Sequence, residues 1–207
     1  MKKLKQGLIW LVYRLLRIIL MGLIYICFRP KLEFASEKAR REAFAEPRVI
    51  VLNHVRGMDG AVAYSLFRHE KLVALTAKDM FDEHPALAAF LTFLPVLPID
   101  RRNASLSWLR SSRQALKTGK HVMLFPEGKC QFDRVTKEMK PGCVLLAASS
   151  GSSLLPIYHN GTYHYVFGRR FRMIVGEPIA VTPPPEGTQG AELQRETDAL
   201  LDVFHDL

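Results

Sequence analysis

The sequence predicts an α/β domain with a mixed, largely parallel sheet flanked by helices. Short apolar runs rich in β-branched residues alternate along the chain with segments of helical length, a pattern typical of parallel strands joined by helices. Polar clusters directly follow several of these runs, and ligands of such sheets bind outside the carboxyl ends of the strands. The length of 207 residues suits one domain with its own core and a shorter appendage.

Residues 1–30 predict a membrane-associated helix. They are basic at the start and almost wholly apolar from Leu8 to Phe28, apart from two arginines. Two arginines near the centre of a spanning helix cost about 5–7 kcal/mol, which the apolar residues roughly offset, so that spanning is marginal. One narrow helical stripe runs through Lys3, Gly7, Trp10, Arg14 and Arg17. This stripe favours a monotopic helix that lies in one leaflet with its cations at the headgroups.

Two other interpretations of this segment fit less well. A cleaved signal peptide has an unbroken apolar region and a small-residue cleavage site, and residues 1–30 lack both. A core helix of a soluble protein would have to cover apolar residues on nearly every face. The sequence therefore predicts a segment that attaches the chain to the cytoplasmic face of a membrane.

The composition limits the possible binding partners and the redox compartment of the protein. The formal charge of +9, from 29 Lys and Arg against 20 Asp and Glu, indicates an anionic partner: nucleic acid, a phosphorylated small molecule or an acidic lipid surface. Nucleic-acid binding lacks support because the basic residues are dispersed and no aromatic-basic recognition motif occurs. The cysteines, Cys27, Cys130 and Cys143, fit neither a disulfide framework nor a zinc site, which favours a reducing compartment.

The domain itself is expected at residues 48–207. Residues 31–47 are polar and lack periodicity, and we expect them to connect the N-terminal helix to the domain. Val49–Leu52 is a short β-branched run that predicts a buried strand, and His54 follows where this strand ends. Asp59 precedes an apolar stretch and is well placed to cap a helix there.

The rest of the domain alternates in the same way. Further strands are predicted at Leu72–Lys78, His121–Phe125, Leu154–His159 and Phe171–Val175, with a short extended piece that ends at Asp100. Helices are predicted at Pro85–Leu94, from a cap at Asn103 to Lys117, at Gly142–Ser150 and at Gln189–Leu207.

The five-residue separation of His54 and Asp59 suits an oriented general base. In a strand-turn-helix segment the chain reverses direction, which can bring the side chains of these two residues together. The carboxylate can then accept a hydrogen bond from one imidazole nitrogen while the other nitrogen faces a cleft. The plainer alternative is a helix-capping aspartate beside an unrelated loop histidine. Residues farther along the chain decide between the two.

Four segments, taken in order, resemble the sequence blocks of the glycerophospholipid acyltransferases, whose best-known members are the 1-acylglycerol-3-phosphate acyltransferases. Asn53–Asp59 resembles the His-x4-Asp signature of that family. The second block of the family is resembled by Pro98–Arg101, the third by Phe125–Gly128 and the fourth by Leu155–Ile157. Lys140–Gly142 also matches a Lys-x-Gly element common there, and the resemblance covers residues 49–163.

The resemblance implies a membrane-associated O-acyltransferase. The enzyme would move a fatty acyl group from acyl-CoA or acyl carrier protein to the hydroxyl of a lysophospholipid, first of all 1-acylglycerol-3-phosphate, which gives phosphatidate. His54 would take the hydroxyl proton, and Asp59 would hold the imidazole tautomer and favour the transient imidazolium. The acyl donor is a co-substrate, and no tightly bound cofactor, metal ion or covalent enzyme intermediate is expected.

The resemblance also implies an acceptor site. Arg101 would hold the phosphate through two hydrogen bonds, while Glu127 and Gly128 would shape the site. Lys129 and Lys140 are further candidate cations. A solvated charged turn around Arg101 and a ligand-free Pro-Glu-Gly turn are the plainer alternatives.

The third block departs from the family pattern. The family usually continues this block as Gly-Thr-Arg-Ser, whereas this chain continues it as Gly128-Lys129-Cys130-Gln131. Cys130 therefore stands in place of an arginine and is most simply a substitution. The head group of the acceptor stays open for this reason.

Alternative functions also stay open. A transacylase, or an acyltransferase for another lysolipid, would differ only in its donor or acceptor. A non-catalytic protein that binds membrane lipids would keep the fold, although the joint presence of His54, Asp59 and Glu127 argues against lost turnover. The acyl chain is expected in an apolar tunnel near Leu87–Leu97, and the oligomeric state is open.

Overall fold

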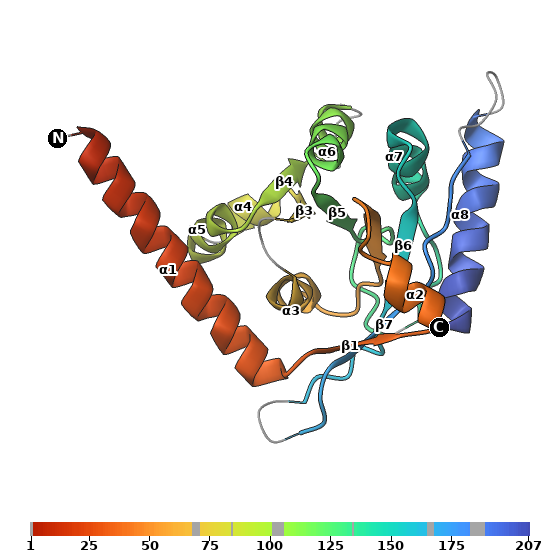
Figure 1. The fold of residues 1–207 in the computed structure, drawn as a ribbon, viewed down its shortest axis with the longest axis horizontal. Helices are drawn as coiled ribbons and strands as arrows, with labels where there is room; N and C mark the ends of the chain where they lie inside the picture. The colour runs from red at the N-terminus through yellow and green to blue at the C-terminus, as the bar shows by residue number, and fades with distance from the viewer. Residues whose placement is uncertain are drawn as a thin grey trace.

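A seven-stranded sheet lies between layers of helices in the computed structural model (Figure 1). The structure describes residues 2–67, 71–83, 85–100, 106–133, 135–164, 168–182 and 189–207. The strands are β1 (Lys31–Phe34), β2 (Val49–Leu52), β3 (Leu72–Ala77), β4 (Val96–Ile99), β5 (His121–Leu124), β6 (Leu154–Tyr158) and β7 (Arg172–Val175). The helices are α1 (Lys2–Phe28), α2 (Glu37–Glu42), α3 (Asp59–Leu66), α4 (Met80–Glu83), α5 (Pro85–Phe93), α6 (Ser107–Lys117), α7 (Gly142–Ser150) and α8 (Gln189–Asp206).

The sheet is mixed and largely parallel, which confirms the predicted fold class. Its strand order is β1-β7-β6-β2-β5-β3-β4, and β6 and β7 form its antiparallel pair. The other neighbouring strands pair in parallel. Because β2, β3, β4, β5 and β6 point the same way, the residues that follow them gather at one edge of the sheet.

Alternate residues of the central strands face two separate cores. Ile50 and Leu52 pack in a cluster with buried side chains of α1 and α3, whereas Val49 and Val51 pack with those of α6, α7 and α8. Both faces of β2 are therefore covered, which explains why its sequence is apolar without alternation. Figure 1 shows α6 and α7 on one side of the sheet and α3 on the other.

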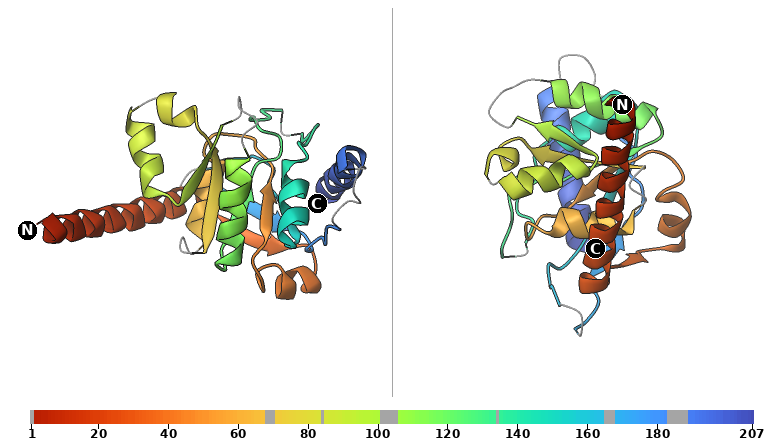
Figure 2. Two further views of the ribbon diagram at one scale, coloured as in Figure 1. Left: turned by 90° about the horizontal axis from the view of Figure 1, so that it is seen from above. Right: turned by 90° about the vertical axis from the view of Figure 1, so that its left-hand side faces the viewer.

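Helix α1 joins the domain through its C-terminal turns. Ile24 and Phe28 are buried in the core beside α3, and Figure 2 shows the N-terminal half of the helix extending beyond the domain. Large apolar side chains are exposed along it at Leu8, Leu11, Val12, Leu15, Leu16, Ile18, Ile19, Leu23, Tyr25 and Ile26. Among the described residues, no helix combines the length and the apolar character needed to cross a membrane.

Three parts of the prediction need correction. Residues 31–47, expected to be a plain connection, contain β1 and α2, and β1 pairs with the distant strand β7. Helix α6 begins at Ser107 with Leu106 in the capping position, later than predicted, and Asn103 lies outside the described residues. Helix α4 was not predicted at all. The sequence pattern misses β1 because a short edge strand depends on its partner rather than on its own residues.

Candidate active site

The candidate site lies where the carboxyl ends of β2, β5 and β6 meet. Leu52 pairs with Ile157 of β6, and Val51 pairs with Leu124 of β5, so that the three strands end side by side. The residues that follow them carry the polar groups of the site. This is the edge at which open α/β sheets bind their ligands.

His54 and Asp59 form the hydrogen bond that their spacing predicts. Nδ1 of His54 lies 3.0 Å from Oδ2 of Asp59, which also accepts hydrogen bonds of 2.7 Å from the backbone N–H groups of Val55 and Arg56. The expected helix cap is wrong: Met58 holds the capping position of α3, and Asp59 is the first helical residue. The carboxylate points toward the loop between β2 and α3 because the backbone N–H groups of that loop need a hydrogen-bond acceptor.

Asp59 is the centre of a buried polar network. Its side chain has 0% exposure, and the Tyr163 hydroxyl donates to its Oδ1. Nε2 of His159 lies 3.6 Å from Oδ2. Burial favours a higher pKa for Asp59, but the hydrogen bonds from His159, His54 and Tyr163 outweigh burial and hold this pKa well below its usual range. Asp59 is therefore a carboxylate that can stabilise a positive charge on His54.

The other interactions of His159 fix its tautomer. Its Nδ1 accepts a hydrogen bond of 3.0 Å from the N–H of Gly161, so that the hydrogen lies on Nε2, 3.1 Å from the backbone oxygen of Asn53. The Asn53 side chain continues the strand pairing beyond β2. It accepts from the N–H of His159 at 2.9 Å and donates to its carbonyl oxygen at 2.8 Å.

Gly161 has a conformation that other residues rarely adopt. Its φ is +65°, and a Cβ built there would lie 2.8 Å from Cβ of Val55. We expect Gly161→Ala to lower the free energy of unfolding by about 2–4 kcal/mol, from backbone strain and overpacking together. Urea denaturation would measure the loss. Gly151→Ala is the matched control. Gly151 also has a positive φ, +69°, but a Cβ built there would have nothing within 4 Å. Equal losses in the two variants would contradict the proposed crowding by Val55.

Glu127 holds the backbone of His54 in place. Its carboxylate accepts a hydrogen bond of 3.0 Å from the His54 N–H and one of 2.6 Å from the Thr136 hydroxyl. The residue is only 5% exposed. Burial raises the pKa of Glu127, and the hydrogen bonds from Thr136 and His54 oppose this rise in part. Glu127 therefore connects the loop after β5 to the loop after β2.

Removing the Glu127 carboxylate is expected to destabilise the fold. Glu127→Ala would leave the His54 N–H and the buried Thr136 hydroxyl without their acceptor, at a cost of about 2–4 kcal/mol in the free energy of unfolding. Glu127→Gln keeps one acceptor oxygen and the side-chain volume, and we expect it to lose only about 1 kcal/mol. Chemical denaturation would compare the two variants. Similar losses in both would show that the negative charge, rather than the hydrogen bonding, is required.

The structure describes most, but not all, of the other predicted site residues. Arg101 lies outside the described residues. Gly128 has a φ of +69°, and a Cβ built there would lie 2.9 Å from Nζ of Lys140, so that glycine allows the lysine to cross this turn. Lys129 and Lys140 are exposed and line the same cavity as His54.

This cavity has a volume of about 770 Å³ and is mostly apolar. His54 and Cys130 line it together with apolar side chains of α3, β3, α5 and β4. Leu87, Leu91 and Leu94 are among these, in the segment where the tunnel was expected. Burial of a long hydrocarbon chain needs such an apolar lining.

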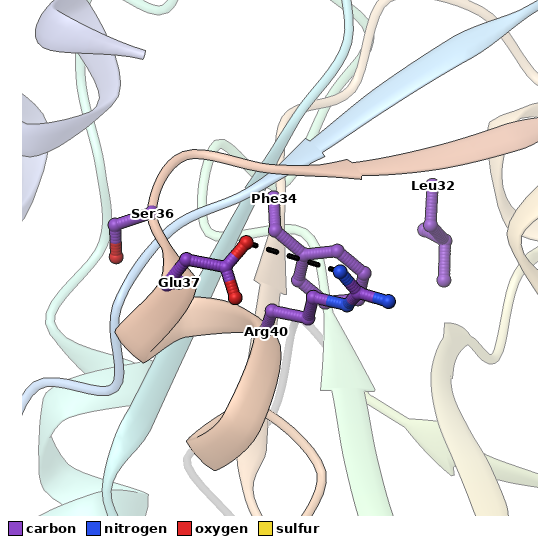
Figure 3. A pocket seen from close by; sticks show the side chains of 5 residues that line it. All are labelled: Leu32, Phe34, Ser36, Glu37 and Arg40. Atoms are coloured by element: carbon purple, nitrogen blue, oxygen red, sulfur yellow. Dashed lines mark ion pairs between the residues drawn. The ribbon is translucent and has the colours of Figure 1, made fainter.

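A second hollow lies at the β1 edge of the sheet, beside α2 (Figure 3). It is lined by Leu32, Phe34, Ser36, Glu37 and Arg40. Its two charged residues, Glu37 and Arg40, are exposed and form an ion pair, with 3.8 Å between Oε1 of Glu37 and Nη1 of Arg40. β7 and β6 separate this hollow from β2 and His54, so that it is not part of the site.

Sequence reasoning missed several residues of the site. It gave no role to His159, Tyr163 or Thr136, and it treated Cys130 as a plain substitution. His159 directly follows β6, so the rule that singled out His54 and Glu127 would have found it. Nε2 of His54 lies 3.4 Å from Sγ of Cys130. The His54 ring also stacks on Phe125, with 4.1 Å between the ring centroids.

The sequence is similar to those of known acyltransferases. The chain is 28% identical over 118 residues to the chloroplastic 1-acyl-sn-glycerol-3-phosphate acyltransferase LPAT1 of Arabidopsis thaliana, covering 56% of this chain and 32% of that protein. It is 27% identical over 108 residues to the 1-acyl-sn-glycerol-3-phosphate acyltransferase of Bacillus subtilis, covering 51% of this chain and 53% of that protein. The chain thus spans about a third and about half of these relatives.

A solved structure has the same fold. The 1-acyl-sn-glycerophosphate acyltransferase PlsC of Thermotoga maritima matches with a TM-score of 0.57 and 18% identity, covering 85% of this chain and 71% of that one. The model of the Acyltransferase family matches residues 31–160, which include His54, Asp59 and Glu127. These residues make up more than half of the sequence, and the chain therefore belongs to the Acyltransferase family.

Proposed function

We propose that the chain is an O-acyltransferase that moves a fatty acyl group from a thioester donor to the hydroxyl of a lysophospholipid. The observation that carries the proposal is the His54 imidazole, which the buried Asp59 orients beside an apolar cavity of about 770 Å³. Membership of the Acyltransferase family supports acyl transfer. The names of the relatives favour 1-acylglycerol-3-phosphate as acceptor and phosphatidate as product.

The proposed chemistry uses His54 as general base. An alcohol is a weak nucleophile, and Nε2 of His54 takes its proton as the oxygen attacks the thioester carbonyl. Asp59 accepts from Nδ1 and stabilises the imidazolium that forms. The imidazolium then returns the proton to the leaving thiolate. Either acyl-CoA or acyl carrier protein serves as donor, since both present the same thioester.

The cavity and its cations place the two substrates. The apolar lining from α5 and β3 holds the acyl chain. Lys129 and Lys140, both exposed, attract the phosphate of the acceptor, with Arg101 as its bidentate partner. Glu127 and Gly128 shape this part of the site through the turn that they form.

Helix α1 places the domain at the membrane that supplies the lysophospholipid. Residues 1–30 form the membrane-associated segment, and residues 31–207, which include β1 of the sheet, form the acyltransferase domain on the cytoplasmic face. The exposed apolar side chains of α1 support this proposal, since the described part of the domain leaves them uncovered. Basic residues at the start of the helix add attraction to anionic lipids.

Release of free thiol tests the proposed function. Detergent-solubilised protein is given palmitoyl-CoA with and without 1-acylglycerol-3-phosphate, and mass spectrometry identifies the lipid product. We expect thiol release that requires both substrates and yields phosphatidate. Equal release without acceptor would replace the proposal by a thioesterase. Absence of turnover across lysolipids and both donor carriers would favour a non-catalytic lipid-binding protein.

A further inference from the structure

We propose that the thiol of Cys130 carries the acyl group covalently between donor and acceptor, so that Cys130, His54 and Asp59 act as a relay. The inference deepens the proposed function and rests on it for the acyl donor. It replaces the direct attack of the acceptor on the donor by two successive transfers.

The three side chains lie in the order that such a relay needs. Sγ of Cys130 lies 3.4 Å from Nε2 of His54, within hydrogen-bonding distance for sulfur, and Nδ1 lies 3.0 Å from the Asp59 carboxylate. A nucleophile, a base and an orienting acid at such distances are the arrangement of an activated nucleophile.

The loop after β5 holds the thiol at this position. The N–H of Gln131, the next residue, donates to the His54 carbonyl oxygen at 2.6 Å. The N–H of Lys140 donates to the Pro126 carbonyl oxygen at 2.9 Å and closes the other side of the loop. Backbone contacts thus fix Cys130 against His54, and both residues line the cavity proposed for the acyl chain.

The environment of the thiol requires a base. Burial raises the pKa of Cys130, and the negative charges of Asp59 and Glu127 raise it further. The residue is therefore a thiol at neutral pH, and it becomes a nucleophile only when His54 removes its proton. This distinguishes Cys130 from a surface cysteine that reacts by itself.

Both steps of the relay balance. In the first step Sγ forms a bond to the acyl carbonyl carbon, the bond from that carbon to the donor sulfur breaks, and His54 passes the Cys130 proton to the leaving thiolate. In the second step the acceptor oxygen forms a bond to the same carbon and the bond to Sγ breaks. His54 then moves the hydroxyl proton to the Cys130 thiolate. The intermediate is itself a thioester, so that the acyl group stays activated.

The other cysteines provide internal controls. Cys143 belongs to α7 and lines the same cavity, but it is buried in the core, and burial raises its pKa to about 12. Cys27 lies near the end of α1, packed against the opposite core. Neither position combines access to the cavity with an adjacent imidazole in the described structure, and Cys27→Ala is the matched control variant.

Intact-protein mass spectrometry tests the relay. Palmitoyl-CoA is added without acceptor to the wild type, Cys130→Ala, His54→Ala and Cys27→Ala, and the adduct is mapped by peptide analysis. We expect one palmitoyl group on Cys130, labile to neutral hydroxylamine, in the wild type and in Cys27→Ala. His54→Ala should lose most of the adduct although it keeps the thiol. Lysophosphatidate added afterwards should discharge the adduct at least as fast as steady-state turnover.

Turnover of the variants completes the test. Cys130→Ala should lose about 10²-fold or more in kcat, and Cys130→Ser, which keeps the side-chain size, should accumulate an ester resistant to neutral hydroxylamine. Full turnover by a folded Cys130→Ala, absence of the adduct in an active wild type, or discharge slower than turnover would each overturn the relay while leaving the proposed function intact. An adduct that forms but is not discharged by any lysophospholipid would instead overturn the proposed function.

Discussion

His54→Ala is expected to lower kcat for acyl transfer by about 10³-fold, within the range that positioned general bases contribute. Nε2 faces the nucleophile while Nδ1 is held by Asp59, and no other imidazole in the described part of the chain lies at the same position beside Cys130. The His54 side chain is 19% exposed, so that its truncation should cost little stability. Thiol release under saturating donor and acceptor would measure the loss.

His164→Ala is the matched control for this variant. His164 is an exposed histidine in the loop after β6, outside the network around Asp59, and its removal should leave kcat unchanged. Thermal unfolding of both variants would show whether the fold is intact. If folded His54→Ala retained activity within tenfold of the wild type, neither direct transfer nor the cysteine relay could use His54 as its base.

The sequence was sufficient for those parts of the site that follow directly from strand ends. Val49–Leu52 and His121–Leu124 are apolar enough to be recognised as buried strands, and parallel pairing then brings His54 and Glu127 to one edge. The close contact between His54 and Asp59 could be predicted because only the short loop between β2 and α3 separates them. Local pattern and sheet topology were enough in these cases.

The missed features depend on contacts between distant segments. β1 pairs with the distant strand β7, and Tyr163 contacts Asp59 after a turn in which Gly161 has a positive φ. The helix cap expected at Asp59 was wrong for a related reason, since the backbone N–H groups of Val55 and Arg56 bind the same carboxylate. No sequence pattern reveals which of several nearby donors an aspartate will bind.

Cys130 shows how a family pattern can mislead. In the third block of the family an arginine usually stands at this position. The sequence comparison shows that the arginine is replaced, but not what the cysteine side chain contacts. The structure places its sulfur 3.4 Å from the imidazole nitrogen that is free of Asp59. A replacement within a binding loop can therefore add chemistry, as well as remove a charge.

Asp59→Asn is expected to lower kcat by about 10²- to 10³-fold without loss of the fold. The amide oxygen can still accept from the N–H groups of Val55 and Arg56 and from Nδ1 of His54, because all three bind the same carboxylate oxygen. The amide nitrogen then faces the Tyr163 hydroxyl, which can rotate to accept. What the variant loses is the negative charge that stabilises the imidazolium. Tyr163→Phe keeps this charge, and we expect a much smaller loss of kcat.

The same substitution should change how stability depends on pH. The pKa of Asp59 is lower in the folded protein than in the unfolded chain, so that its ionised form contributes stability above the usual carboxyl pKa of about 3.9. This contribution is lost as the pH falls toward the folded-state pKa, and Asp59→Asn never has it. Urea denaturation should therefore find the wild type more stable than Asp59→Asn at about pH 5, and by a shrinking margin below about pH 4. A margin that stayed constant in acid would show that the Asp59 carboxylate is not stabilised by its buried donors, and the electrostatic role assigned to it beside His54 would be wrong.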